Sequence, residues 1–538
     1  MAKLITAKEA AELIRDGASV GVAGMGLSGF PEEIACAIRD RYKETGHPKG
    51  ITLHQSSAMG DHGYGNGFLG WDKTKRPADM PAPEGVRGLS RLGEGGEGLV
   101  SHWTGAHVMS AEALNAQAAQ GKITGNCLPQ GVAVNLWREI AAGRPGILTK
   151  VGLGTFVDPR VEGGRMNAET KEDIAELVTF GGEEYLFYKS FPLDVALLRG
   201  TVGDEFGNIS FMHEGIVNEG LAVAEAAHNS GGIVIVQVEY LAKGGSLNPK
   251  DVKIPGILVD YVVEATDPMA SWQAEGVYFE PSFSGQIKKP VRSIPALPLD
   301  ERKVIARRCA MEVTPGAVLN LGVGISANVG NILVEEGCID MVTMASESGM
   351  IGGVPCPLPN FGSSYNPECT LEHNAAFDLI DGGGLTTTCL GLGECDEDGN
   401  VNVSKFGKRL IGPGGFIDIT NATPKVVFCG TFTGKASLRV ADGKLVIEQE
   451  GPVRKFKKKV QQITFAGRYV KPGQEILYVT ERCVFRLLDG KMVLTEIAPG
   501  VRLKEDILDL MDFEPVVPEE LKVMDEGIFQ EKWGGLVK

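Results

Sequence analysis

The sequence predicts an α/β protein in which two related, open α/β domains with Rossmann-like layers are fused in one chain. The length of 538 residues is too great for a single hydrophobic core. Units of buried strand, glycine-rich turn and helix occur in both halves, and this alternation favours parallel sheets covered by helices. We expect a first domain over 1–284, a linker over 285–298 and a second domain over 299–538.

The first half begins with elements that have clear boundary signals. Thr6 can cap the first helix, and Glu9 at its third position completes a capping box. The expected elements are, in order, a helix over 7–16 ended by Gly17, a buried strand over 18–23, a turn over 24–31, a helix over 32–42 and a strand over 51–55. This strand-turn-helix order makes the turn a candidate ligand site.

That turn matches G-x-G-x-x-G through Gly24, Gly26 and Gly29, which is the pattern of a dinucleotide-binding loop. The strand over 51–55 does not end in Asp or Glu, so no carboxylate is placed to bind a ribose hydroxyl. An NAD-dependent dehydrogenase is therefore a disfavoured alternative. We expect an anion-binding turn at a helix N-terminus, with Gly26 and Gly29 lining the substrate.

Three further segments of the first half have local patterns of their own. Residues 70–99 are rich in Gly, Pro and charge and are predicted to form an exposed loop. By local chemistry alone, residues 129–131 are predicted to form a turn. Residues 148–158 are predicted to hold a glycine-rich apolar strand.

A short pattern recurs in the two halves. The turn D-x-x-G-N begins at Asp204 and again at Asp396. Asp204 precedes the buried strand at Ile233 by 29 positions, and Asp396 precedes the strand at Val426 by 30. This near-constant spacing is what two copies of one domain would give.

The second half repeats the strand-turn-helix order. The expected elements are, in order, a helix over 302–311, a buried strand over 317–321, a turn over 322–325, a helix over 326–336, a strand-like run over 341–345, a glycine-rich segment over 381–384, a turn over 412–418 and sheet-forming segments over 478–482 and 496–501. The basic cluster at 454–459 is expected to be a solvated face or hairpin rather than a phosphate contact.

The composition argues against several classes of function. A net charge of −16 argues against a nucleic-acid or anionic-membrane partner, although a small phosphorylated ligand needs only local amides and a few cations. Ten cysteines without a C-x-x-C pair indicate free thiols in a reducing cytoplasm. There is no signal peptide and no apolar run of about 18 residues, so we expect a cytoplasmic protein without a membrane span.

The sequence offers no recognisable metal site. Neither H-E-x-x-H nor a cluster of Cys and His at ligand spacing occurs, so we expect no metal. Four histidines fall in one region at irregular spacing and are expected to be structural or substrate-lining: His54, His62, His102 and His107.

The stretch Ser346-Glu347-Ser348-Gly349 carries the candidate chemistry. It places a lone carboxylate between a strand-like run and a glycine-rich turn, at the kind of strand end where open α/β sheets place their ligands. Carboxylates are known covalent nucleophiles, and we expect Glu347 to be one. The alternative from local sequence is a solvated Glu in a turn.

Together the motifs resemble the family I CoA-transferases, within them the single-chain propionate CoA-transferase and acetate/acetoacetate CoA-transferase type. The resemblance covers nearly the whole chain. Its most specific segments are 154–160, 347–349 with 351–355, 381–384 and 480–485. Two-subunit members carry the same halves on separate chains, which would explain the internal repeat.

The resemblance implies roles for individual residues. Glu347 matches the catalytic glutamate, Gly415 the glycine whose N–H serves the oxyanion hole, and Gln130 a glutamine near the reacting carbonyl. The turn Gly322-Val323-Gly324-Ile325 falls where the family holds part of CoA. Gly383 and Gly414 are expected to line the substrate.

The sequence departs from the family pattern at three places. Residues 70–85 look like an insertion near the active-site entrance, Thr386 stands where close relatives usually have Asp, and Ser101 where they have Gly. The acyl group is therefore not fixed by the sequence.

The resemblance also implies a ping-pong transfer of CoA from a short-chain acyl-CoA to an acceptor carboxylic acid, through a glutamyl-CoA thioester. Acetate, propionate, butyrate or acetoacetate would be the acids, as in short-chain fatty acid and ketone body metabolism. CoA would be a substrate, with no cofactor bound permanently, and a homo-oligomer, dimer or tetramer, is expected. The alternatives are an acyl-CoA hydrolase that uses the same glutamate, and a non-catalytic sensor or sugar-phosphate isomerase on a related fold.

Overall fold

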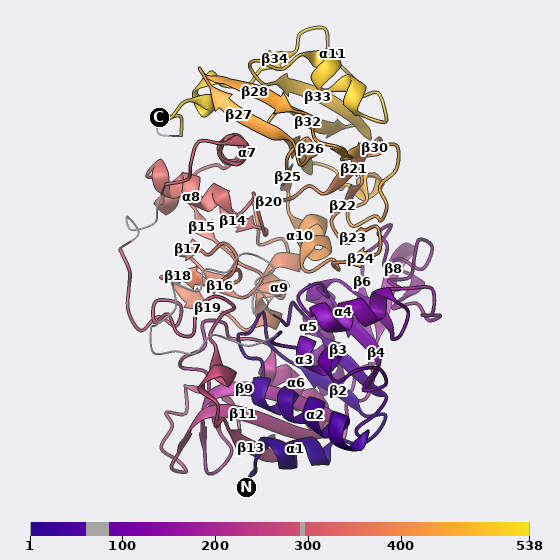
Figure 1. The fold of residues 1–538 in the computed structure, drawn as a ribbon, viewed down its shortest axis with the longest axis vertical. Coiled ribbons are helices and arrows are strands. Elements are labelled where there is room, and N and C mark those ends of the chain that lie inside the picture. Colours follow the sequence, from indigo (N-terminus) through magenta and orange to yellow (C-terminus); the bar gives the residue numbers. More distant parts are fainter. Residues whose placement is uncertain (1, 61–85, 291–295, 537–538) are drawn as a thin grey trace.

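The computed structural model describes residues 2–60, 86–290 and 296–536. It contains two large sheets, one built from strands between residues 3 and 264 and the other from strands between 318 and 523. The halves are stacked along the long axis, with the N-terminal half at the bottom of Figure 1. Two related α/β domains in one chain are thereby confirmed, while the boundaries at 285–298 stay a prediction.

The first sheet is parallel along its main path, β1-β13-β11-β9-β2-β3-β4-β5. Its strands are β1 (Lys3–Leu4), β2 (Ser19–Val22), β3 (Ile51–Gln55), β4 (Val100–Gly105), β5 (Thr124–Cys127), β9 (Val195–Asp204), β11 (Ile233–Ala242) and β13 (Tyr261–Glu264), with β10 (Ile209–Ser210) and β12 (Val252–Ile254) as an antiparallel side branch. Successive residues of a strand face opposite ways, so Val195 and Leu197 join one core cluster while Ala196 and Leu198 join another.

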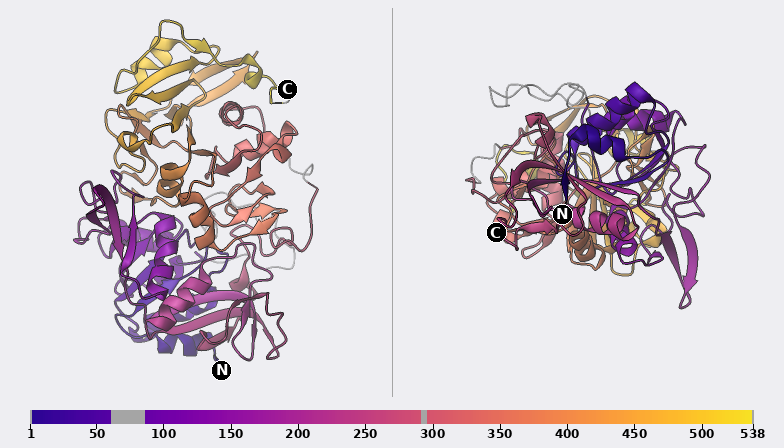
Figure 2. Two further views of the ribbon diagram at one scale, coloured as in Figure 1. Left: turned by 180° about the vertical axis from the view of Figure 1, so that it is seen from behind. Right: turned by 90° about the horizontal axis from the view of Figure 1, so that it is seen from below.

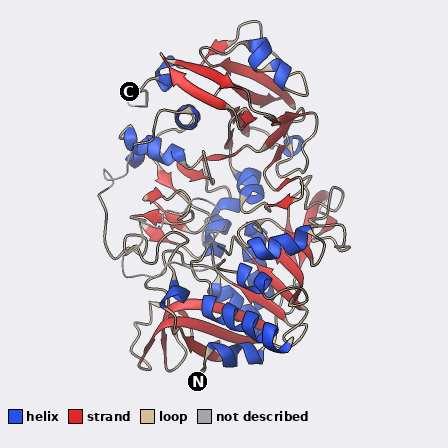
Figure 3. Cartoon of the chain, in the orientation of Figure 1, coloured by secondary structure: helices blue, strands red, loops and turns tan. Residues whose placement is uncertain are grey.

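Helices contribute to the apolar cluster on each face of this sheet. Figure 3 shows the helices in blue and the strands in red. The helices of the first half are α1 (Ala7–Leu13), α2 (Glu32–Thr45), α3 (Ser90–Glu94), α4 (Glu112–Ala119), α5 (Gln130–Ala141) and α6 (Gly220–Asn229). Residues of α1 to α4 belong to the cluster of Val195, and α6 belongs to that of Ala196. Helix α5 contributes to both clusters, which places its N-terminus at the border of the domain.

The second sheet has the order β15-β14-β20-β25-β31-β32-β33-β34. Its strands are β14 (Val318–Leu321), β15 (Thr343–Met344), β20 (Thr387–Gly391), β25 (Lys425–Cys429), β31 (Glu475–Val479), β32 (Cys483–Leu488), β33 (Lys491–Ile497) and β34 (Lys522–Val523). Pairs from β15 to β31 are parallel, and β31, β32 and β33 are antiparallel. Helices α7 (Glu301–Ala310) and α8 (Asn328–Glu335) pack on one face, and α9 (His373–Asp381) and α10 (Phe416–Ala422) on the other.

Small sheets and one further helix surround these layers. They are β6 (Gly146–Thr149), β7 (Glu176–Phe180) and β8 (Glu183–Lys189); β16 (Met350–Ile351) and β19 (Cys369–Thr370); β17 (Val354–Pro355) and β18 (Ser364–Tyr365); β21 (Glu394–Asp396), β22 (Val401–Asn402) and β30 (Phe456–Lys457); β23 (Lys405–Phe406) and β24 (Arg409–Leu410); β26 (Thr433–Gly434) and β29 (Val453–Arg454); β27 (Ser437–Ala441) and β28 (Lys444–Gln449); and α11 (Leu503–Asp506). Within the described ranges, no helix is both long and apolar enough to cross a bilayer.

The D-x-x-G-N repeat has the same hydrogen bonds in both halves. The Asp204 carboxylate accepts the N–H groups of Phe206 and Asn208 and the Asn208 side-chain amide. The Asp396 carboxylate accepts the corresponding groups of residues 398 and 400. This Asx-type turn explains why Asp and Asn recur at these positions.

Two predictions for the first half were wrong in part. The capping box of Thr6 and Glu9 is present, but the helix ends at Leu13 because Ile14 adopts an extended conformation and enters the core. Of the predicted exposed loop over 70–99, residues 70–85, including the insertion, lie outside the described residues, as does His62. Residues 86–99 are largely buried and contain α3, because Leu89 and Leu92 join the first core cluster.

Other local predictions were overridden by tertiary packing. Residues 129–131 are not a turn: Pro129 is the N-cap of α5. A strand was predicted within residues 148–158. The observed strand covers residues 146–149, and turns follow it. The turn predicted over 412–418 becomes α10 from Phe416. In the basic cluster, Lys455 points inward to the Leu392 carbonyl and the Thr431 hydroxyl, so the cluster is not uniformly solvated.

The two domains share a packed interface formed by α5, α9 and α10. Val134 of α5 belongs to the core cluster of the second domain, and Ile417 of α10 belongs to that of the first. The Asn374 side chain donates to the Val134 carbonyl, and Arg138 forms an ion pair with Asp378 at 2.5 Å. Figure 2 shows these middle segments between the two stacked halves. This interface fixes groups of both domains around one cavity.

Candidate active site

A cavity of about 310 Å³ lies between the two domains and brings together seven of the residues predicted to form the site. These are Gly26, Gln130, Gly322, Val323, Glu347, Gly414 and Gly415. The remaining lining is mostly apolar, with Met25, Leu358, Phe361, Leu390 and Phe416 among its larger side chains. Chain segments more than 380 residues apart therefore meet at one place.

Glu347 is held in a tight turn after β15. The Ser346 N–H donates to the Met350 carbonyl at 2.9 Å, and the Gly349 N–H to the Ser346 carbonyl at 3.0 Å. Gly349 has φ +94°, a conformation that side-chain-bearing residues rarely adopt. The Ser348 hydroxyl donates to the Gly362 carbonyl at 2.5 Å. These bonds fix the turn and leave the Glu347 side chain 9% exposed at the cavity wall.

The environment of Glu347 favours a reactive carboxyl. Burial raises its pKa above the ordinary value of 4.5, because a charge is poorly solvated there. The nearby charge of His373 and a hydrogen bond from Asn320 act in the opposite direction. A partly desolvated carboxylate is a better nucleophile than one in water, so this arrangement suits covalent chemistry.

Gln130 and Gly415 are fixed by the interface on the same wall. The Gln130 N–H donates to the Gly414 carbonyl at 3.0 Å, and the Gly414 N–H donates to the Ala106 carbonyl at 3.0 Å. Gly415 is the N-cap of α10. Within the described ranges, the Gly415 N–H has no hydrogen-bond acceptor. This N–H is available to a substrate oxygen, and the helix end supplies a favourable partial positive charge.

Four of the predicted site residues do not line the cavity. Gly29 faces the side chain of Asn218, whose amide nitrogen would lie 2.0 Å from an added Cβ. Gly383 lies beyond the C-terminal end of α9, with nothing within 4 Å of an added Cβ. In the turn after β14, Gly324 is exposed and Ile325 packs against the third core cluster. Only the first two residues of that turn reach the cavity.

Three residues around Glu347 were not predicted from the sequence. His373 and Glu219 form a buried pair behind Gln130, and Asn320 lies in β14 beside the turn that carries Glu347. Of the histidines considered from sequence, His54 stacks on Phe191 as a structural group, and His102 bonds the Thr124 hydroxyl. His107 lines the cavity. No group of three or more potential metal ligands occurs in the part of the chain that the structure describes.

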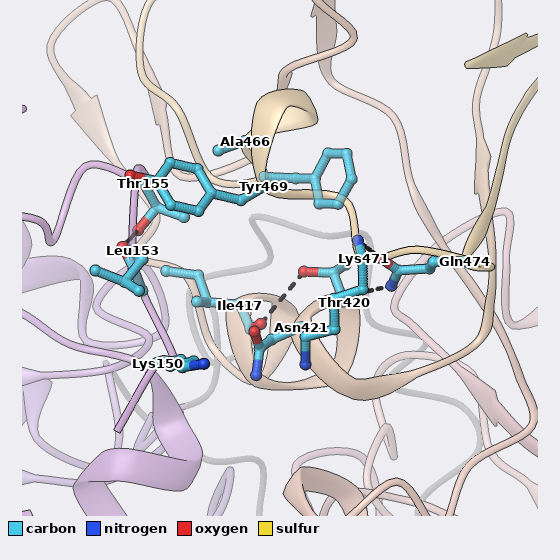
Figure 4. A pocket seen from close by; sticks show the side chains of 12 residues that line it. Lys150, Leu153, Thr155, Ile417, Thr420, Asn421, Ala466, Tyr469, Lys471 and Gln474 are labelled. Carbon is cyan, nitrogen blue, oxygen red and sulfur yellow. Dashed lines mark hydrogen bonds between the residues drawn. The ribbon is translucent and has the colours of Figure 1, made fainter. Parts of the chain in front are cut away.

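A second cavity of about 200 Å³ lies on the opposite side of α10 (Figure 4). It is lined by Lys150 and Thr155 from the first domain and by Tyr469, Lys471 and other residues from the second. None of the predicted site residues lies there. Helix α10 separates the two cavities, because its residues at 416 and 419 face the first and those at 417, 420 and 421 face the second.

Asp381 at the end of α9 provides a stability prediction. Burial, followed by the charge of Asp378, raises the pKa of Asp381 to about 7, and its Oδ1 has no hydrogen-bond partner among the described residues. Because the folded state binds this proton more tightly than the unfolded chain, its contribution is most favourable below pH 3.8 and is lost as the pH rises towards 7. We expect Asp381→Asn to raise the Tm by about 2 °C at pH 8 and to leave it unchanged at pH 3.5, measured by calorimetry. Equal shifts at both pH values would contradict this explanation.

Comparison with known proteins places this geometry among enzymes of one kind. A sequence model described as coenzyme A transferase matches residues 84–265. The chain is 59% identical to the caffeate CoA-transferase of Acetobacterium woodii, over 100% of this chain and 99% of that protein. It is 40% identical to the acetate CoA-transferase YdiF of Escherichia coli O157:H7, over 99% and 96%. A crystal structure of the acyl-CoA transferase YdiF from that organism, a thioester complex with CoA, matches with a TM-score of 0.88 and 39% identity over 100% of this chain and 98% of the other.

Proposed function

Because this chain belongs to the coenzyme A transferase family, we propose that it moves CoA between carboxylic acids through a covalent thioester on Glu347. The observation that carries the proposal is the position of Glu347, buried at the wall of a cavity that is also lined by the Gln130 side chain and by Gly415, whose N–H has no acceptor among the described residues. A transfer without water or ATP needs an acceptor for the acyl group, and a protein carboxylate can serve.

The proposed reaction has two bond exchanges in each half. The Glu347 carboxylate attacks the thioester carbonyl, and CoA leaves as a thiolate, which gives a mixed anhydride. The thiolate then attacks the Glu347 carbonyl carbon and releases the free acid, which leaves a glutamyl-CoA thioester. An acceptor carboxylate attacks this thioester and runs the sequence in reverse. Each attack passes through a tetrahedral oxyanion.

Two donors on the cavity wall suit that oxyanion. The Gly415 N–H has no acceptor among the described residues, and the Gln130 amide can supply a second donor. Removing one such donor typically lowers kcat by about 100- to 1,000-fold. The apolar lining also limits water, which would hydrolyse the anhydride and the thioester.

The cavity supports a second candidate for the acyl group. Short acids such as acetate or propionate follow from the resemblance and from the acetate CoA-transferase relative. The large apolar lining near Glu347, including Met25, Leu358 and Phe361, would also bury an aromatic acid, and the 59% identical relative is named for caffeate. Comparing kcat/KM for acetyl-, propionyl-, butyryl- and caffeoyl-CoA with one acceptor decides between them. A preference of tenfold or more for caffeoyl-CoA would assign the aromatic class.

Intact-protein mass spectrometry tests the covalent step. Wild-type protein incubated with a reactive acyl-CoA should gain the mass of CoA, and borohydride should convert the adduct to an alcohol that maps to Glu347. Glu347→Ala should gain no mass. No adduct with any acyl-CoA of the panel, together with equal exchange by Glu347→Ala, would remove the nucleophile assignment. Release of free acid without an acceptor, at the rate of transfer, would favour the hydrolase.

The rate of adduct formation should depend on pH through Glu347. Only the carboxylate attacks, and burial raises its pKa above 4.5, so the rate should rise with pH through an apparent pKa above 4.5. The charge of His373 from α9 acts on Glu347, and the ionisable side chains of Glu275 and His107 line the same cavity. Rapid-quench measurement of the rate of adduct formation from pH 4 to 8 gives the rising part of this pH profile. A rate that stays constant down to pH 4 would contradict a buried nucleophile.

A further inference from the structure

The second cavity, on the other side of α10 from Glu347, has polar groups without partners. Both domains line it, with Lys150 from the first and Asn421 and Lys471 from the second. Among the described residues, the Lys471 amino group has no hydrogen-bond acceptor and no ion-pair partner, and the Asn421 side-chain amide has no hydrogen-bond partner. Figure 4 shows the Asn421 side chain between those of Lys150 and Lys471. The cavity therefore offers donors that the described part of the protein does not use.

Lys150 has a partner but keeps donors to spare. Its amino group donates to the Glu183 carboxylate at 2.9 Å and lies 5.3 Å from the centre of the Tyr185 ring. An ammonium group has three N–H donors, so this one bond leaves others for a ligand. The side chains of the pair are 42% and 59% exposed, and ion pairs of this kind contribute little to stability. A ligand can therefore share Lys150 without breaking a strong interaction.

The charges around Lys471 favour an anion in this cavity. Burial, followed by the like charge of Lys150, lowers the pKa of Lys471, while the charge of Asp381 acts in the opposite direction. Burial raises the pKa of Asp381 to about 7, so this carboxyl is only partly ionised at neutral pH. Two ammonium groups thus face one space with an incomplete counter-charge. A bound anion would relieve their repulsion, whereas a cation would add to it.

The rest of the lining restricts the kind of anion. Its larger apolar side chains are Leu153, Ile417, Phe465 and the ring of Tyr469. The volume of about 200 Å³ is below the roughly 300 to 1,000 Å³ of sites for drug-sized ligands, so the ligand must be small. We propose that this cavity binds a small carboxylate with a short apolar chain, whose oxygens accept from Lys150, Asn421 and Lys471. The bound acid would bridge the two domains behind α10, and this role does not depend on the covalent chemistry of Glu347.

Amine labelling of the wild-type protein tests this site without a variant. Butyrate is the probe, an acylating reagent specific for lysine is the label, and peptide mass spectrometry reads each lysine separately. Saturating butyrate should slow labelling of Lys150 and Lys471 by about threefold or more, relative to chloride at equal ionic strength. Lys8, exposed on α1, is the matched control and should not change. No lysine of the described ranges lines the first cavity, so butyrate bound beside Glu347 would not give this signal.

A charge-removing variant then tests the assigned donors. In Lys471→Gln, the butyrate concentration that half-protects Lys150 should rise by about tenfold or more, because one charge-assisted hydrogen bond is lost. Lys8→Gln should behave as wild type, and calorimetry establishes that both variants fold. Absence of protection by butyrate, equal protection of Lys8, or unchanged protection in Lys471→Gln would overturn the proposal. Inorganic phosphate that protects both lysines as well as butyrate does would overturn the assignment to an acid with an apolar chain.

Discussion

Replacing Glu347 by Gln should lower the rate of CoA transfer by about 10⁴-fold or more, because removal of a covalent nucleophile leaves only binding and the oxyanion donors. The change preserves the size of the side chain and its position in the turn. Burial of Glu347 raises its pKa, so a neutral amide should also be tolerated there without loss of stability. Steady-state exchange of labelled acid into acyl-CoA measures the effect.

Glu347→Asp is the informative companion variant. It keeps the carboxylate but withdraws it by one methylene, and a displacement of about 1 Å can lower a rate roughly 100-fold. We therefore expect Asp to retain more activity than Gln, with a detectable CoA adduct. Both variants should bind acyl-CoA as wild type does, which equilibrium dialysis can establish. Equal activities of Gln and Asp would contradict a covalent role for this carboxyl.

The turn that carries Glu347 was predictable because its signal is local. A short apolar strand followed by Ser-Glu-Ser-Gly requires a tight turn, and the glycine at 349 adopts the positive φ that such a turn needs. The D-x-x-G-N turns were likewise predictable, because the Asp side chain bonds the backbone within four residues. Signals of this kind depend on few neighbours, so the chain's later packing does not change them.

The pair behind Gln130 gave no comparable signal. His373 and Glu219 are 154 positions apart, and they meet only because the interface brings the start of α9 against the domain that carries α6. Locally, His373 is one polar residue at the start of an amphipathic helix. A long-range pairing has no periodicity in the sequence. The sequence therefore predicted a candidate nucleophile and one nearby amide, but not the buried pair behind that amide.

Gly383 was predicted to line the substrate, but it does not line the cavity. The motif at 381–384 belongs to the most specific part of the resemblance, so its glycine was assigned to the substrate. Helix α9 begins near the cavity at His373, and its rise of 1.5 Å per residue carries the chain roughly 15 Å away before Gly383. The prediction of a turn over residues 129–131 was wrong for a related reason. Packing against α9 and α10 extends this locally turn-like sequence into a helix.

Gly349→Ala should be the most damaging change outside the reacting groups. An added Cβ would lie 2.2 Å from the Leu371 carbonyl oxygen, and the backbone at Gly349 has φ +94°. The Leu371 N–H also donates to the Gly349 carbonyl at 2.8 Å, so the two segments cannot separate without losing this bond. The clash would displace Glu347, two residues before it, and His373, two residues after Leu371. We expect adduct formation to fall by about 100-fold or more.

Gly337→Ala separates the two causes of that loss. Gly337 has φ +69°, but nothing lies within 4 Å of its added Cβ, so the substitution adds backbone strain of roughly 1 kcal/mol without a clash. Gly337→Ala should lower the Tm slightly and leave the adduct rate unchanged, whereas Gly349→Ala should reduce the rate even in protein that calorimetry shows to be folded. Equal rates in the two variants would mean that the Ser-Glu-Ser-Gly turn does not set the position of the nucleophile. A selective loss of rate in Gly349→Ala would have a different meaning. It would show that the contact between this turn and the segment before α9 fixes the Glu347 carboxylate relative to the His373 imidazole.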